Sequence, residues 1–191
     1  MQAGRTIGPE EGQPQMSEAE KGTGHAAEAV SMARERYLDD RHAYGCAETV
    51  FTVLKSAYGL PDEADPSAAS ALNGGIAYSG GTCGALTGAA LAVGLLAERR
   101  MDHHGAAKRA AREIVAATMD AFREAYGVTD CRDLIGYDLR APGGHQAFLE
   151  SGAWRDGCMN QIEWVVARLA ALADPAAWDR ALREVENSPA H

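Results

Sequence analysis

The sequence predicts an all-α protein, a compact single-domain helical bundle of five or more helices built around a Gly/Ala-rich buried helix. Apolar residues recur at helical spacing in several segments, and no segment alternates polar and β-branched residues as a strand does. The stretch 74–97 carries no charge in an otherwise charge-rich chain. We therefore expect this stretch to be buried on every side at the centre of the core.

The composition limits both the organisation and the partners of the protein. A chain of 191 residues with 46% hydrophobic and 24% charged residues is typical of a soluble protein with one core. Residues 1–24, rich in Gly, Pro, Gln and Glu, are predicted to be a disordered lead-in, and residues 25–187 a four-cysteine helical domain. The net charge of −9 argues against nucleic-acid binding.

The sequence favours a cytoplasmic protein without a membrane span. Residues 1–11 contain no apolar run, so we expect no secretory signal peptide. Residues 76–97 are uncharged and long enough to cross a bilayer, but Gly, Ser and Thr interrupt their first half. Because neither flank combines an aromatic belt with a basic cluster, a buried helix is the better interpretation.

Small residues form one face of the central helix. Gly84, Gly88 and Ala92 recur every four residues, which places them on the same side. Glycine weakens a helix by about 1 kcal/mol relative to alanine, so this pattern indicates close packing against another backbone. The partner is either another helix of this chain or, if the face is exposed, a second copy in a homodimer.

Three helices are predicted before the central one, at about 26–38, 46–58 and 67–72. The first has an apolar stripe opposite a charged face, and the second has apolar residues on one face and ends at Gly59 and Pro61. Ser67 is a suitable N-cap for the third helix, which Asn73 and Gly74 end.

Five helices are predicted from the central one onward, at about 82–97, 105–126, 131–135, 158–172 and 178–185. The second of these has the clearest amphipathic pattern and ends at Gly127. Thr129 and Asp130 are suitable caps for the third. A Gly- and Pro-containing loop follows at 136–144, and residues 145–157 have no clear periodicity.

The four cysteines all fall in the first turn of a predicted helix, at Cys46, Cys83, Cys131 and Cys158. A helix N-terminus stabilises a thiolate, which is the reactive and metal-ligating form of cysteine. The spacings of 37, 48 and 27 residues contain no Cys-x-x-Cys and exclude local zinc-ribbon, thioredoxin-type and haem-attachment motifs. We predict that the four sulfurs converge as catalytic or metal-ligating groups, either on an iron–sulfur or other metal centre or as thiol–disulfide pairs.

The segment Cys83-Gly84-Ala85-Leu86-Thr87-Gly88 resembles the Cys-Gly-Ala-x-x-Gly motif of the C-GCAxxG-C-C family of redox-active proteins. The other three cysteines fall in the family's order, and the resemblance covers about residues 26–172. It implies redox activity through the cysteines, an unknown redox partner, helical structure and prokaryotic origin, but no defined reaction. A related domain occurs in some multihaem cytochromes, but this chain lacks Cys-x-x-Cys-His, so we expect no haem.

Several residues near the cysteines have alternative interpretations. Gly81, Gly84 and Gly88 are predicted to lie where a cofactor would approach, since a Gly-rich helix start can bind an anion. Glu48 is either a proton carrier or, as we favour, an acid that suits the first turn of its helix. His103 and His104 face different ways on a turn, which favours solvent exposure over metal binding.

Cys83 is expected to be the most acidic and most reactive thiol. The Gly-rich approach leaves it open, and its helix start has no nearby carboxylate. Cys131 and Cys158 have neighbouring aspartates, and Cys46 has Glu48 close by. The alternative for the whole set is a non-enzymatic helical module, possibly dimeric, in which the cysteines are core residues.

Overall fold

The computed structural model describes residues 24–39, 41 and 43–186. These residues form helices joined by turns and loops, with no strand among them. The α-helices are α1 (Gly24–Tyr37), α2 (Cys46–Ala57), α3 (Gly84–Arg100), α4 (His104–Tyr126), α5 (Cys131–Ile135), α6 (Gly144–Ser151), α7 (Met159–Ala170) and α8 (Pro175–Glu186). Two 3-10 helices, Ser67–Leu72 and Ala171–Ala173, and a π-helical turn, Trp154–Cys158, complete the set. The all-α prediction is confirmed, while the predicted disordered lead-in lies, except for Gly24, outside the described residues.

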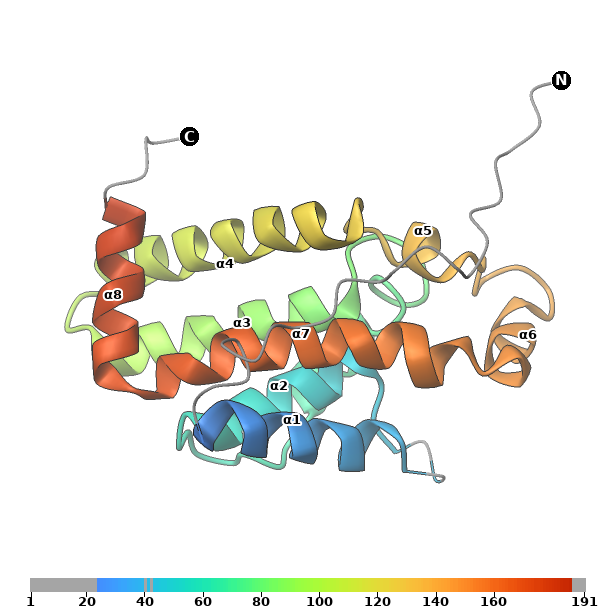
Figure 1. The fold of residues 1–191 in the computed structure, drawn as a ribbon, viewed down its shortest axis with the longest axis horizontal. Coiled ribbons are helices and arrows are strands. Elements are labelled where there is room, and N and C mark those ends of the chain that lie inside the picture. The colour runs from blue at the N-terminus through green and yellow to red at the C-terminus, as the bar shows by residue number, and fades with distance from the viewer. Residues whose placement is uncertain (1–23, 40, 42, 187–191) are drawn as a thin grey trace, which may run out of the picture.

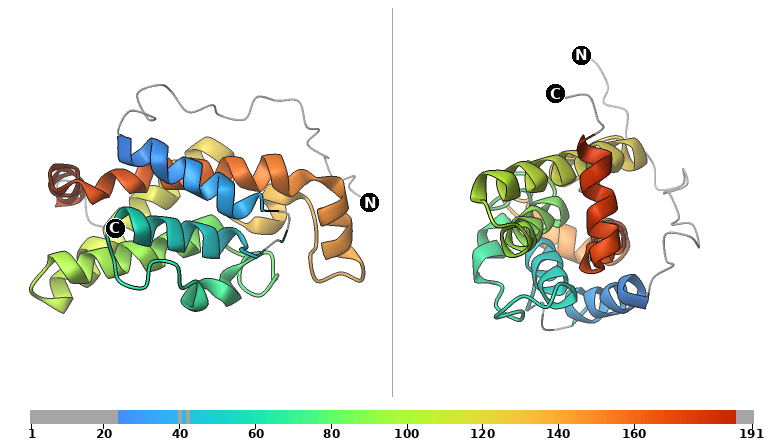
Figure 2. Two further views of the ribbon diagram at one scale, coloured as in Figure 1. Left: turned by 90° about the horizontal axis from the view of Figure 1, so that it is seen from below. Right: turned by 90° about the vertical axis from the view of Figure 1, so that its left-hand side faces the viewer.

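Helices α2, α3 and α7 pack on one another and form the centre of the bundle. Helix α1 covers α2 and α7, and α4 covers α3 (Figures 1 and 2). In Figure 1, α8 crosses the left-hand end of the bundle, and α5 and α6 lie at the right-hand end. In the part of the chain that the structure describes, no helix combines the length and the apolar character needed to cross a bilayer.

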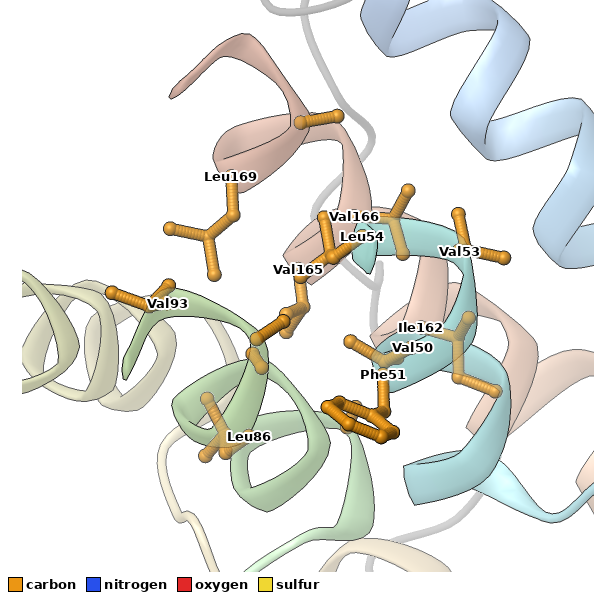
Figure 3. Close-up of a cluster of buried hydrophobic side chains, with 14 of the residues drawn as sticks. Val50, Phe51, Val53, Leu54, Leu86, Val93, Ile162, Val165, Val166 and Leu169 are labelled. Atoms are coloured by element: carbon orange, nitrogen blue, oxygen red, sulfur yellow. The ribbon is translucent and has the colours of Figure 1, made fainter. Parts of the chain in front are cut away.

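The core forms between the apolar faces of the three central helices (Figure 3). Val50 and Leu54 from α2, Val93 from α3, and Ile162 and Val165 from α7 have at most 1% of their surface exposed. In α2 and α7 these residues stand three or four positions apart, so each pair lies on one side of its helix. The amphipathic patterns predicted these buried faces correctly.

The small-residue face of α3 packs within the chain. A Cβ atom added to Gly88 would overlap the backbone carbonyl of Ala47, and one added to Gly84 would overlap the Cys46 sulfur. The predicted close contact is therefore present, with α2 as the partner helix. The expectation of burial on every side was wrong, because Leu95, in the C-terminal part of α3, is 45% exposed.

Residues 74–78 form a left-handed turn that the sequence did not predict. Five consecutive residues have positive φ angles, including 64° at Ile76, 49° at Ala77 and 61° at Tyr78. This conformation costs about 1–2 kcal/mol for each residue with a Cβ. Ala77 N–H donates to Ala71 O (2.7 Å), and the Arg140 guanidinium donates to Ala77 O (2.9 Å). Hydrogen bonds to the preceding 3-10 helix and to a residue far along the chain therefore hold the turn.

The segment before α7 also differs from the prediction. Residues 145–157, which lacked a clear pattern, contain most of α6 and of the π-helical turn. Cys158 was expected to begin a helix, but it has helical backbone angles and closes the π-helical turn that leads directly into α7. The prediction failed because the helix begins earlier, at Ala153, directly after Gly152, which also ends α6.

Candidate thiol site

Three of the four cysteines line one cavity of about 260 Å³ near the starts of α2 and α5. These are Cys46, Cys131 and Cys158. Cys83 is the N-cap of α3 and is 3% exposed, and its Sγ lies 3.6 Å from Oε1 of Gln161. The fold therefore brings cysteines from four separate segments to the same end of the bundle.

A short antiparallel bridge fixes Cys83 beside Cys131. The bridge pairs Thr82 with Asp130, the residues immediately before the two cysteines. Cys83 N–H donates to Thr129 O (2.8 Å), and Cys131 N–H donates to Gly81 O (2.7 Å). This pairing sets the starts of α3 and α5 next to each other although they are distant in sequence.

Polar side chains cap the start of α2, where Cys46 is the first helical residue. Glu48 accepts hydrogen bonds from Gly45 N–H (2.8 Å) and from Nδ2 of Asn73 (2.8 Å). Asn73 Oδ1 accepts from Ala47 N–H (2.9 Å), and the Cys46 thiol donates to the same oxygen at 3.8 Å. Glu48 thus serves the helix start, as we favoured.

Asn73 was missed as a site residue. The sequence predicted only that Asn73 and Gly74 end a short helix. The residues around Asn73 do not predict its hydrogen bonds to α2. Its hydrogen bond to Ala47 spans 26 residues, a separation that only the folded chain closes.

Burial raises the pKa of all four thiols, but Cys46 differs in what opposes this effect. The backbone around Cys46 donates hydrogen bonds that favour its thiolate and offset part of this rise in its pKa. They come from Gly74, Ala47, Gly84 and Cys46 itself. Burial raises the pKa of Cys131 to about 12 and raises those of Cys83 and Cys158 as well. Cys46 is also the least buried of the four.

The expectation that Cys83 is the most acidic thiol was therefore wrong. Desolvation is the largest cause of its raised pKa and outweighs the hydrogen bond with Ala85 at the start of α3. A helix N-terminus stabilises a thiolate only where its charge is not otherwise stripped of solvent.

Cys46 also interacts electrostatically with each of the other cysteines. After burial, its negative charge is the largest cause that raises the pKa of Cys83, Cys131 and Cys158. Ionised Cys46 thus holds the other three in the neutral thiol form. The arrangement favours one thiolate at a time, located at Cys46.

Aromatic side chains form much of the remaining cavity wall. Tyr78 from the left-handed turn packs on His145, with ring centroids 5.0 Å apart. On the same cavity, Tyr37 meets Trp154 edge to face at 5.8 Å. Tyr37 also forms a side-chain hydrogen bond with Cys158.

The cysteines have the donor chemistry of a thiolate-bound metal centre, but their sulfur atoms are not grouped so that three of them could bind one ion. Among residues 24–39, 41 and 43–186, no group of three or more His, Cys, Asp and Glu side chains is placed to hold one ion. The four cysteines are free thiols in this structure. His103 and His104 are exposed, and Nδ1 of His104 contacts Oε1 of Glu98 at 2.5 Å.

The glycines predicted to approach a cofactor have backbone roles. Gly84 and Gly88 face Ala47 of α2, which occupies the space beside them. The Gly81 carbonyl accepts the hydrogen bond from Cys131 that completes the bridge.

Fold and site together define a class of all-α proteins with a cysteine-lined cavity at one end of a helical bundle. The family model described as "Putative redox-active protein (C_GCAxxG_C_C)" matches residues 44–172, and the chain belongs to this family. No curated protein and no solved structure matches the chain. The matched region contains all four cysteines and every helix from α2 to α7.

Alkylation of the reduced protein by iodoacetamide should modify Cys46 first. We expect its rate to exceed that of each other cysteine by about tenfold or more at pH 8, because its thiolate is hydrogen-bonded and it is the one cysteine whose residue is not fully buried. The rate should still rise above pH 9, since burial raises the pKa of Cys46. Peptide mass spectrometry across a pH series measures both effects, and faster labelling of Cys83 would contradict the assignment.

Proposed function

We propose that the protein is a dithiol–disulfide redox protein in which Cys46 is the reactive thiol and Cys131 or Cys158 is its partner. The observation that carries this proposal is that these three cysteines share one cavity, with Cys46 the least buried. Membership of a redox-active family supports it. The thiolate-favouring hydrogen bonds around Cys46 supply the nucleophile that such chemistry requires.

The reaction transfers two electrons and two protons. With a disulfide as the acceptor, the Cys46 thiolate attacks one sulfur, a mixed disulfide forms, and the other acceptor sulfur leaves as a thiolate. The second cysteine then loses its proton and attacks Sγ of Cys46. A protein disulfide forms, and the acceptor leaves as two thiols. Reduction by an external dithiol reverses these steps.

Loss of the Cys46 charge assists the second step. While Cys46 is a thiolate, its charge raises the pKa of Cys131 and Cys158. Once Cys46 forms the mixed disulfide, that charge is gone and the partner ionises more readily. The site therefore favours the order in which Cys46 reacts first and its partner second.

Thiol counting in dithiothreitol redox buffers tests this function. We expect the anaerobically purified protein to lose two thiols reversibly, and mass mapping to place Cys46 in the new disulfide. An iron–sulfur centre would instead give visible charge-transfer absorption with bound iron and sulfide, which would replace this proposal by metal-based redox chemistry. Four thiols that remain reduced in every buffer, in colourless metal-free protein, would support the structural module.

A further inference from the structure

The cavity beside Cys46 has aromatic walls and neither lysine nor arginine among its described lining residues. Its aromatic side chains are Tyr37, Tyr44, Tyr78, His145, Phe148 and Trp154. Ile135, Leu139 and Leu149 add aliphatic surface. Such walls suit a flat apolar molecule, because ring faces and edges pack on aromatic side chains with little polar loss.

The charges around the cavity disfavour an anionic ligand. The carboxylate of Glu48 lines the cavity and already accepts hydrogen bonds from Gly45 and Asn73. Arg140 donates to Ala77 O, and Arg132 pairs with Asp138 at 3.1 Å, so both guanidinium groups are engaged outside the lining. A phosphate or carboxylate in the cavity would lose its water without gaining a lysine or arginine partner from the lining.

The volume of the cavity matches about one or two rings. A cavity of about 150 Å³ accommodates benzene, and the thiol cavity measures about 260 Å³. A nucleotide or a dinucleotide cofactor is too large to be enclosed there.

We propose that the cavity binds an uncharged one- or two-ring quinone as the electron acceptor of the dithiol. This inference rests on the proposed function, which requires an acceptor of two electrons and two protons. Quinones are planar, uncharged and aromatic when reduced, and they accept this number of electrons and protons. Their charge and shape therefore match the cavity, and their redox stoichiometry matches the dithiol.

The reaction balances within the site. The Cys46 thiolate adds to a ring carbon of the quinone and forms a carbon–sulfur bond. The second cysteine attacks Sγ of Cys46, a sulfur–sulfur bond forms, and the carbon–sulfur electron pair returns to the ring. The two protons lost by the thiols end on the two quinone oxygens, so the products are one protein disulfide and one hydroquinone.

The test compares an uncharged and an anionic quinone of similar ring size. Anaerobic, fully reduced protein is mixed with 1,4-naphthoquinone or with 1,4-naphthoquinone-2-sulfonate, and hydroquinone formation and thiol loss are followed. Free dithiothreitol with the same two compounds corrects for their different intrinsic reactivities. We expect the protein to prefer the uncharged quinone by about tenfold or more after this correction.

A positive charge placed on the cavity wall should weaken or abolish the preference for the uncharged quinone. Leu139 lines the cavity and is partly buried. Leu139→Lys should lower the corrected preference about tenfold, while Leu139→Met, an uncharged control, should preserve it. The ratio of the two rates removes any effect of the new lysine on the pKa of Cys46.

A corrected rate ratio of one in the unaltered protein, or a stable quinone adduct without a disulfide, would overturn the quinone inference. The proposed function is judged separately, by whether Cys46 forms a reversible disulfide in dithiothreitol buffers without any quinone. Failure of disulfide formation with every oxidant would overturn both.

Discussion

Cys46→Ala should lose reversible thiol oxidation while keeping its helical fold. Burial is the largest cause that raises the pKa of Cys131, and it persists in this variant although the charge of Cys46 is lost. Cys83 and Cys158 are buried with raised pKa values, so no other thiol replaces Cys46. We expect the rate of two-thiol oxidation to fall by about a hundredfold or more. Thiol counting against time measures the rate, and far-ultraviolet circular dichroism verifies the fold.

Cys83→Ala is the matched control for this variant. Cys83 is buried, contacts Gln161 and does not line the cavity, so its loss should leave a reversible Cys46 disulfide. If Cys83→Ala abolished oxidation while Cys46→Ala retained it, the assignment of the reactive thiol would be reversed.

Gly88→Ala should destabilise the protein by about 1–3 kcal/mol, although alanine is the better helix former. The added Cβ would overlap the Ala47 carbonyl, which belongs to the backbone of α2 and cannot rotate away. Gly94→Ala, on the same helix, places its Cβ in open space and should be neutral or stabilising by up to about 1 kcal/mol. Urea unfolding of the two variants measures the difference, and equal midpoints would show that α2 and α3 can separate at no cost.

The sequence predicted the elements whose signals are local. Helix α5 has the predicted bounds, Cys131–Ile135, and α4 begins one residue before the predicted start. The prediction of α4 depends on apolar spacing and that of α5 on the caps Thr129 and Asp130. Each helix is followed by a glycine with a positive φ angle, Gly127 or Gly136. Such features are set by neighbouring residues and are visible without a fold.

The left-handed turn was not predictable from local preferences. Ile76 is a β-branched residue with a φ of 64°, a conformation that such residues rarely adopt. Contacts from Arg140 and from the preceding 3-10 helix hold the turn, and Arg140 is 63 residues from the carbonyl it binds. Tertiary contacts therefore override the local preference at this position.

For the site, the sequence predicted the cysteines as candidates but not their relative burial. The position of Cys83 at the start of α3 was predicted, and the favourable helix end is present. Its burial depends on α7, which contributes Gln161, and no motif near Cys83 contains that information. The same holds for Asn73, whose contact with Cys46 exists only after α2 and the 3-10 helix pack together.

The assembly of the cavity from distant segments makes the unfolded chain more vulnerable to oxidation than the native one. The cavity takes Tyr37 from α1 and Cys158 from the turn before α7, so it is complete only when nearly the whole domain has folded. Until then all four thiols are exposed and titrate near the ordinary value of about 8.5. Folding must therefore precede oxidation, because a disulfide formed in the unfolded chain joins whichever thiols meet first and rearranges in seconds to hours.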